Sequence, residues 1–270
     1  MSYPNAPNPY ASPSAVAAAP AAGPVTFKPI EKIDYLRMYK YVFENPNWVM
    51  NIVLGAVCAI IPVIGPLVMI GYQFEVVSSL LATQGLRYPD FNFNRFVDYL
   101  VRGLWPFLVQ LVASLVLTPV ILIIVLVPIM ILGGIAGAAG EKGAGGVFAV
   151  GLPLLILIDF PLLVLVSLIL VPPLIRAGLA RDFAEGFNFN WAIDFLKKTW
   201  LESFLALLFI AVSAGLLAIL GVLACYIGTF VVMPLIFLAQ AHMYYQLYLL
   251  YLSRGGSPVV EKVPAYAPPR

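Results

Sequence analysis

Six long apolar runs dominate this chain and limit what it can fold into. A helix needs about 20 apolar residues to cross the hydrocarbon core of a bilayer, so five of the six runs are long enough to span it unaided. The first run is shorter, and it spans only if it extends past Pro62 or lies where the bilayer thins. The runs occupy residues 48–61, 64–86, 104–132, 147–180, 202–224 and 227–252.

Charged residues are too scarce for a soluble fold. Only 10% of the 270 residues are charged and 62% are hydrophobic, whereas a soluble domain carries about a quarter charged residues. A water-facing surface for one large domain cannot be built from so few charges. The chain is therefore predicted to be an all-α polytopic membrane protein whose main partner is the lipid bilayer.

A sequence repeat groups the apolar runs into pairs. The string FNFN occurs at residues 91–94 and again at 187–190. In the aligned stretches FNFNRFVDYLVR and FNFNWAIDFLKK, Asp98 lies over Asp194, and a weaker third copy, EKIDYLRMYK, places Asp34 there. Each copy precedes two apolar runs, which predicts six transmembrane helices in three parallel repeats of an interfacial amphipathic helix and a helix pair. The predicted repeats cover about 28–87, 88–186 and 187–254.

Basic residues indicate how the helices are oriented. If all six runs span, 14 of the 15 Lys and Arg residues fall on one side of the membrane, and only Lys142 falls on the other. Positive residues near membrane segments remain in the cytoplasm, so both termini and the amphipathic helices are expected there. Residues 133–146, GGIAGAAGEKGAGG, are then expected to form a flexible outer loop.

The two ends of the chain differ from the predicted membrane domain, residues 28–254. Residues 1–27 contain six prolines and no charge, so they can neither bury a core nor sustain a helix. Residues 255–270 have a similar composition. Both ends are predicted to be flexible cytoplasmic tails.

Asp159 is a carboxylate inside an apolar run, and such residues are functional candidates because burying their charge is costly. Pro161 follows it, and Arg181 lies 20 residues further on, which is about one bilayer crossing. Similar proline spacings precede Arg87 and Arg254. Since proline suits the first turn of a helix, this pattern favours Asp159 as the cap of a helix that begins at the outer interface. The alternative is a midplane carboxylate with a proton- or cation-linked role.

Three further polar side chains lie inside apolar runs, namely Glu75, Gln240 and His242. Glutamine and histidine in a membrane helix seek partners across a helix interface, so a packing role is favoured for them. The alternative is a place on a transport path.

Asp34, Asp98 and Asp194 are repeat-equivalent residues of the predicted interfacial helices. Asp98 stands four residues before Arg102, and Asp194 stands four residues before Lys198. Residues at this spacing share one helix face. We therefore predict two ion pairs within these helices.

The residues show no recognisable chemistry of an enzyme. The net charge of +2 and the scattered basic residues argue against nucleic acid as a partner. Cys58 and Cys225 each lie in an apolar run without a second Cys or His at metal-ligand spacing. A nucleophile–base arrangement and a phosphate-binding glycine loop are also missing from the sequence. We therefore expect no catalytic residue, no cofactor and no metal.

Three segments of the chain resemble a bacterial membrane family known as domain of unknown function 4013. They are IIPVIGPLVMIGY at 60–72, YPDFNFNRFVDYLVRG at 88–103 and PPLIRAGLARDFAEGFNFNWAIDF at 172–195. The resemblance covers about residues 30–254. It implies a multi-pass protein of the bacterial inner membrane, and it implies no activity and no catalytic residue.

Two functions remain open at this point. The favoured one is a non-enzymatic scaffold or accessory subunit, which binds other membrane proteins or further copies of itself. The alternative is a transporter or channel for a small solute or ion, with a path among the three repeats. Transporters usually place several polar residues at the bilayer midplane, whereas most charges here lie at the predicted cytoplasmic boundary.

Overall fold

Helices make up the regular structure of this protein in the computed structural model, which describes residues 27–224 and 227–262. The described residues contain no strand, which confirms the all-α prediction. In chain order the elements are α1 (Arg37–Lys40), the 3-10 helix η2 (Tyr41–Glu44), α2 (Trp48–Ala59), α3 (Ile64–Ala82), the 3-10 helix η3 (Phe93–Arg95), α4 (Phe96–Ala138), α5 (Gly140–Leu168), α6 (Val171–Ala180), the 3-10 helix η4 (Ala184–Phe187), α7 (Phe189–Leu223) and α8 (Ile227–Ser253).

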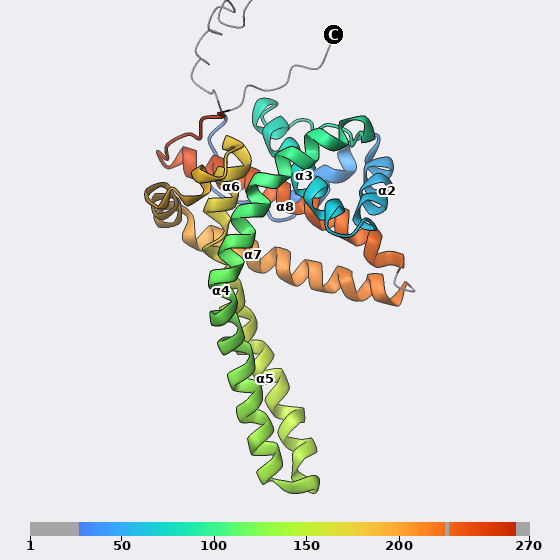
Figure 1. Ribbon diagram of the computed structural model, residues 1–270, viewed down its shortest axis with the longest axis vertical. Coiled ribbons are helices and arrows are strands. Elements are labelled where there is room, and N and C mark those ends of the chain that lie inside the picture. Colours follow the sequence, from blue (N-terminus) through green and yellow to red (C-terminus); the bar gives the residue numbers. More distant parts are fainter. Residues whose placement is uncertain (1–26, 225–226, 263–270) are drawn as a thin grey trace, which may run out of the picture.

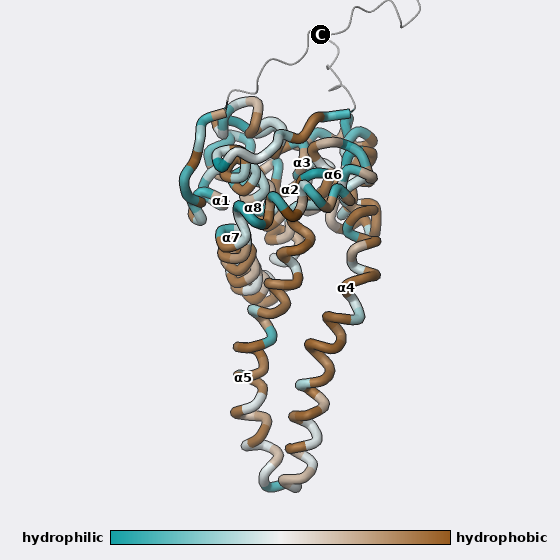
Figure 2. Tube along the Cα trace, turned by 90° about the vertical axis from the view of Figure 1, so that its left-hand side faces the viewer, coloured by the Kyte–Doolittle hydropathy of each residue, from teal (hydrophilic) through white to brown (hydrophobic). Residues whose placement is uncertain are grey.

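The molecule has two parts, a head and an arm (Figure 1). The head contains α1, α2, α3, α6, α8 and the first turns of α4, which pack on one another. Beyond the head, α4 and α5 run together to a common tip, and we call residues 111–156 the arm. The arm is mostly hydrophobic along its length, whereas hydrophilic residues gather on the head (Figure 2). α7 packs along α8 and leaves the head in a different direction from the arm (Figure 1).

α3 and α4 approach each other closely because each presents a glycine at the contact. A Cβ added at Gly71 would lie 1.7 Å from the carbonyl oxygen of Tyr99, and one at Gly103 would lie 2.0 Å from that of Leu67. Small residues let two helix backbones touch in this way, as in many membrane helix pairs. The contact fixes the first turns of α4 on the head.

α8 forms the centre of the head. From Leu238 to Leu252 every residue except Gln240 is buried, and the helix contacts α2, α3 and α7. Its sequence in this stretch, LAQAHMYYQLYLLYL, is rich in polar and aromatic residues. Such a helix suits an interior of protein, where neighbours satisfy its polar groups.

Five helices among the described residues are long and apolar enough to cross a membrane, while α2 is shorter. α2 has 12 residues, about 18 Å of helix, and does not cross a hydrocarbon core of about 30 Å by itself. It ends before Pro62, and Val63 adopts a positive φ of 64°, which turns the chain into α3. The first apolar run therefore does not extend past Pro62 as one helix.

Two local predictions about helix boundaries are wrong. Residues 92–103 and 188–200 are not separate interfacial helices, because η3 leads directly into α4, which continues to Ala138, and α7 runs from Phe189 to Leu223. Residues 133–146 are not a flexible loop either, since α4 and α5 are separated only by a turn at Ala139. Gly140 supplies the positive φ of 68° that this turn needs, and the alanines around it sustain the helices.

Part of the predicted C-terminal tail, residues 255–262, is packed against the head. The backbone N–H of Lys262 donates to the Ala180 carbonyl at 3.1 Å. Trp191 Nε1 donates to the Ser257 carbonyl at 3.0 Å. These bonds join the segment to α6 and α7. Residues 1–26 of the predicted N-terminal tail and residues 263–270 lie outside the described residues.

Candidate functional site

A cluster of ion pairs joins α3 to α4 where the two helices emerge from their glycine contact. Glu75 lies one turn after Gly71, and Arg102 directly precedes Gly103, so the close approach brings the two side chains together. Arg102 Nη1 donates to Glu75 Oε2 at 2.8 Å, and Arg95 Nη1 donates to Glu75 Oε1 at 2.7 Å. Only 6% of the Arg102 side chain is exposed. Both cations therefore hold one half-buried carboxylate.

The same cluster borders a cavity of 580 Å³ that also receives residues from distant parts of the chain. Arg181, at the C-terminal end of α6, has left-handed backbone angles of φ 55° and ψ 43°. Its Nε lies 2.7 Å from Glu261 Oε1, which comes from the packed C-terminal segment. Three arginines and three carboxylates thus line the cavity, which we call the arginine cavity. They are Arg95, Arg102, Arg181, Glu75, Asp98 and Glu261.

The predicted ion pairs of the interfacial aspartates are confirmed at one position and wrong at the other. Lys198 Nζ donates to Asp194 Oδ2 at 2.8 Å, as predicted. Arg102 binds Glu75 instead of Asp98, because its helix face is turned toward α3. Asp98 is half exposed and lies 3.6 Å from Arg95 Nε.

Asp34 and His242 belong to one network that holds the N-terminal segment on α8. Gln246 Nε2 donates to the Asp34 carbonyl at 2.9 Å, and Gln246 Oε1 accepts from the Asp34 backbone N–H at 2.7 Å. His242 Nδ1 lies 2.9 Å from Gln246 Nε2, and its ring lies 4.5 Å from that of Tyr41. His242 is therefore buried between partners of the head.

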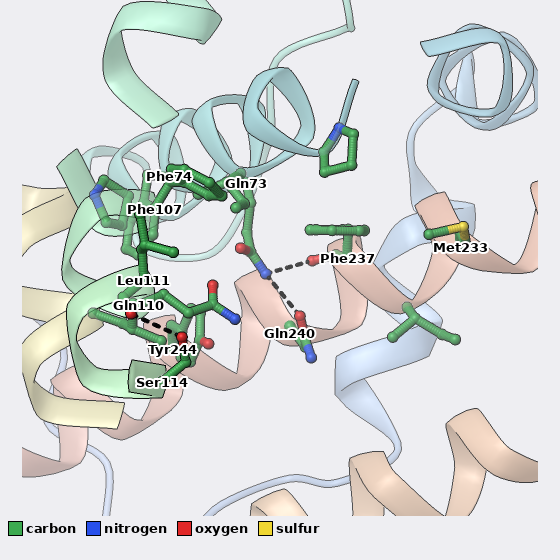
Figure 3. Close-up of a pocket in the computed structure, with 15 residues that line it drawn as sticks. Gln73, Phe74, Phe107, Gln110, Leu111, Ser114, Met233, Phe237, Gln240 and Tyr244 are labelled. Carbon is green, nitrogen blue, oxygen red and sulfur yellow. Dashed lines mark hydrogen bonds between the residues drawn. The ribbon is translucent and has the colours of Figure 1, made fainter. Parts of the chain in front are cut away.

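A second cavity, of 570 Å³, lies between α3, α4 and α8. Gln73 Nε2 donates to the Phe237 carbonyl at 3.1 Å and to Gln240 Oε1 at 3.3 Å, and the two amide groups point at each other (Figure 3). Gln110 and Ser114 come from α4 on another side of the cavity (Figure 3). The remaining lining is apolar or aromatic and carries no charge. We call this space the glutamine cavity.

Asp159 lies within α5, 19 residues after its first residue, Gly140. The cap prediction is wrong because α5 continues through Pro161 to Leu168. At 1.5 Å per residue, Asp159 is about 29 Å along the helix from the tip. The side chain is partly exposed, and none of the residues that the structure describes forms a hydrogen bond or ion pair with it.

The packed C-terminal segment is also held by charge outside the long helices. Lys262 Nζ lies 2.9 Å from Glu185 Oε1 and 3.3 Å from Asp182 Oδ2. Arg176 Nε donates to Glu185 Oε2 at 2.8 Å. The hydrogen bonds from Lys262 and Arg176 hold the pKa of Glu185 below its usual value of 4.5. Deprotonated Glu185 therefore stabilises the position of this segment.

Metal-ligating side chains do not gather within residues 27–224 and 227–262, where no group of three or more His, Cys, Asp or Glu is placed to hold a metal ion. Cys58 is buried, and its Sγ donates to the Gly65 carbonyl at 3.7 Å. Cys225 lies outside the described residues.

Sequence reasoning selected Glu75 and Gln240 but missed the residues that complete their surroundings. Arg181 and Glu261 are 80 positions apart, and no short motif links them. Gln110 lies on a helix of mostly aliphatic residues, where a lone glutamine gives little signal. Only the packing of α3, α4, α6 and α8 brings these side chains together.

Comparisons with known proteins give one family. A family model described as "Protein of unknown function (DUF4013)" matches residues 54–239, which is more than half of the chain. Neither curated proteins nor solved structures gave a match.

Proposed function

The chain belongs to the DUF4013 family of proteins of unknown function, and we propose that it acts as a non-enzymatic scaffold or accessory subunit of an assembly in the bacterial inner membrane. In this proposal the paired helices of the arm cross the membrane. The head lies at the cytoplasmic side with both termini, and the tip of the arm lies outside. Its partners are lipid and either other membrane proteins or further copies of the chain.

The apolar surface of the arm is the observation that carries the proposal. Leu115, Val116 and Met130 are 69% to 72% exposed, and most other residues of the arm are exposed or half buried. Soluble monomers rarely expose such a surface over so long a stretch. Lipid covers it in a bilayer, and a transmembrane helix of another protein can replace that lipid without loss of hydrophobic burial.

The distribution of charge supports the orientation. Glu141 and Lys142 are the charged residues of the tip, and Asp159 is about 29 Å away along α5. The hydrocarbon core is about 30 Å thick. A bilayer that places the tip at its outer surface therefore has Asp159 near its cytoplasmic boundary, on the same side as the many basic residues of the head.

Local structure at the starts of the second and third proposed repeats supports a shared organisation. Asn92 and Asn188 hold the same position in the two FNFN strings, and each caps the helix that follows. The Asn92 side chain accepts from the Asn94 N–H at 2.9 Å, and the Asn188 side chain accepts from the Trp191 N–H at 3.1 Å. The equivalent residues Tyr99 and Phe195 are both fully buried. The second and third proposed repeats thus begin with the same local structure.

Photo-crosslinking in living cells tests the scaffold. A photoreactive amino acid at Met130, on the exposed arm, should give a discrete protein adduct, whereas the same residue at the buried Leu247 should give none. Adducts of one size from Met130 and from Leu115, absent at Leu247, are the expected result. A monomer without adducts at both arm positions would contradict the proposal.

The glutamine cavity favours one second function, the transport of a small neutral polar solute. Its three glutamines can exchange hydrogen bonds with such a solute in otherwise apolar surroundings. Asp159 would contribute to coupling only if the flux is driven by protons or cations. Flux in proteoliposomes that is present in the parent protein and lost in Asp159→Asn, at equal folded protein, would overturn the scaffold proposal. We expect no flux in either form, because Asp159 lies near a boundary and outside the cavity lining.

A further inference from the structure

Two buried guanidinium donors in the arginine cavity lack an acceptor. Within the described residues, three buried side-chain atoms have no hydrogen-bond partner, and Arg102 Nε and Arg181 Nε are two of them. Arg181 Nε is at ion-pair distance from Glu261, but the contact does not have hydrogen-bond geometry. A buried charged donor without an acceptor is costly, and in a natural protein it calls for an explanation, such as a bound ion or ligand.

The charge of the cavity depends on the C-terminal segment. Glu75 already accepts from Arg95 and Arg102, and Asp98 lies against Arg95. Glu261 is thus the carboxylate that neutralises Arg181. Movement of this segment would leave three arginines facing two carboxylates, which is a net positive cavity of 580 Å³.

The chemistry of the donors selects the ligand. Arginine binds planar or tetrahedral oxyanions through several N–H groups at once, and phosphate offers enough oxygens for two guanidinium groups. Trp105 also lines the cavity on α4.

We propose that the arginine cavity binds a phosphate group through Arg102 and Arg181, and that the Glu261 carboxylate holds the same position when the C-terminal segment is packed. Phosphate enters as the headgroup of an anionic phospholipid or as a soluble phosphate. Either source displaces Glu261 from Arg181. Arg181 ends α6 with a left-handed backbone, which is uncommon for a residue other than glycine and is found at ligand clamps.

Native mass spectrometry on the delipidated full-length protein tests the proposal in two arms. One arm titrates phosphatidylglycerol, and the other titrates inorganic phosphate. In Arg181→Gln, binding should be about tenfold weaker, because one charge-assisted hydrogen bond is lost. In Glu261→Gln, binding should be tighter, because the competing carboxylate is gone. Arg87→Gln, which removes an exposed arginine outside the cavity, is the matched control and should bind like the parent.

The two arms identify the source of the phosphate. Binding of phosphatidylglycerol that inorganic phosphate does not displace assigns a lipid headgroup, and the reverse assigns a soluble phosphate. If Arg181→Gln does not fold, Arg181→Lys replaces it, since lysine keeps the charge but cannot form the guanidinium fork. Equal affinity of the parent and the Arg181 variant, equal weakening in Arg87→Gln, or weaker binding in Glu261→Gln would each overturn the proposal.

Discussion

The head and the arm differ in how much of their apolar helices is buried by other parts of the protein. In α3, 61% of an apolar 18-residue stretch is buried, and in α8 56% is buried, whereas in α4 the figure is only 6%. The least buried of these helices is also the most apolar, which reverses the pattern of a soluble protein. Lipid is the reason, because a helix that faces acyl chains needs no polar face while a helix inside the head can carry polar groups that find partners.

The comparison explains where the polar residues are. Gln73, His242 and Gln246 are each buried and each hydrogen-bonded within the head. In the arm, by contrast, Ser114 and Thr118 bond to carbonyls of their own helix. The hydrogen bonds of its polar groups therefore favour one arrangement of the helices in the head. The stability of the arm depends instead on the lipid around it. The following substitutions and the change of pH should therefore affect the two regions differently.

Gly103→Val should have the largest effect, because it acts on the head. A Cβ at this position would lie 2.0 Å from the Leu67 carbonyl oxygen, so α3 and α4 must separate, which we expect to cost more than about 3 kcal/mol. Size-exclusion chromatography and thermal unfolding in detergent would measure the loss. Gly133→Val is the control, because no atom lies within 4 Å of a Cβ there. Equal stability of the two variants would contradict the packing described.

Met130→Arg should come next, because it acts on the arm. Met130 is 72% exposed, a position where a soluble protein would tolerate arginine. In a bilayer the same change should reduce insertion by about 3 kcal/mol, since Met130 lies about 14 Å from the tip, near the midplane. The fraction of chains resistant to carbonate extraction would report it, with Met130→Leu as the control. Normal insertion of the arginine variant would show that the arm is not surrounded by lipid.

Glu75→Gln should have a smaller effect, again in the head. It leaves the buried Arg102 without a carboxylate, and we expect a loss of about 2 kcal/mol because Glu75 is only partly buried. Asp98→Asn, which changes a half-exposed carboxylate of the same cluster, should change the unfolding free energy by less than about 0.5 kcal/mol. Chemical unfolding of both variants in micelles compares them. An Asp98 variant that is the less stable of the two would refute the assignment of Arg102 to Glu75.

The smallest effect is expected at the packed C-terminal segment when the solution is acidified. The pKa of Glu185 is lowered from 4.5 in this structure, so its contribution is fully present above about pH 4.5 and is lost as the pH falls through the lowered value. Hydrogen exchange of the amides of residues 257–262 should therefore speed up below pH 4.5, relative to its intrinsic rate. In Glu185→Gln the exchange should be faster already at pH 7. Unchanged protection in that variant would contradict the role of the Lys262 contact.

The helices that are apolar enough to face lipid could be predicted from the sequence. The run 104–132 is long and almost uniformly aliphatic, so no tertiary contact was needed to recognise it as a membrane helix. Helix ends were harder, because the glycines of 133–146 suggested a loop, while the alanines between them keep α4 and α5 helical up to Ala139. Pro161 likewise predicted a helix start, although proline is tolerated inside membrane helices.

The candidate site could be predicted only in part, because most of its contacts join different helices. Asp194 finds Lys198 on its own helix, so spacing alone identified that pair. Arg102 has an equally good local partner in Asp98, yet the glycine contact turns it toward Glu75 on α3. Arg181 and Glu261 meet only because the C-terminal segment returns to α6. Pairs within one helix follow from spacing, whereas pairs between helices follow from packing.

Site-directed labelling of cysteine tests most directly whether the arm crosses the membrane with the head on the cytoplasmic side. With Cys58 and Cys225 replaced by alanine, single cysteines are introduced as Lys142→Cys at the tip, Asn190→Cys in the first turn of α7, next to the head, and Asn5→Cys near the N-terminus. A membrane-impermeant maleimide added to intact spheroplasts should label the cysteine at position 142 alone, and lysis should expose the other two. Labelling of position 142 only after lysis, or of position 190 before it, would contradict the account.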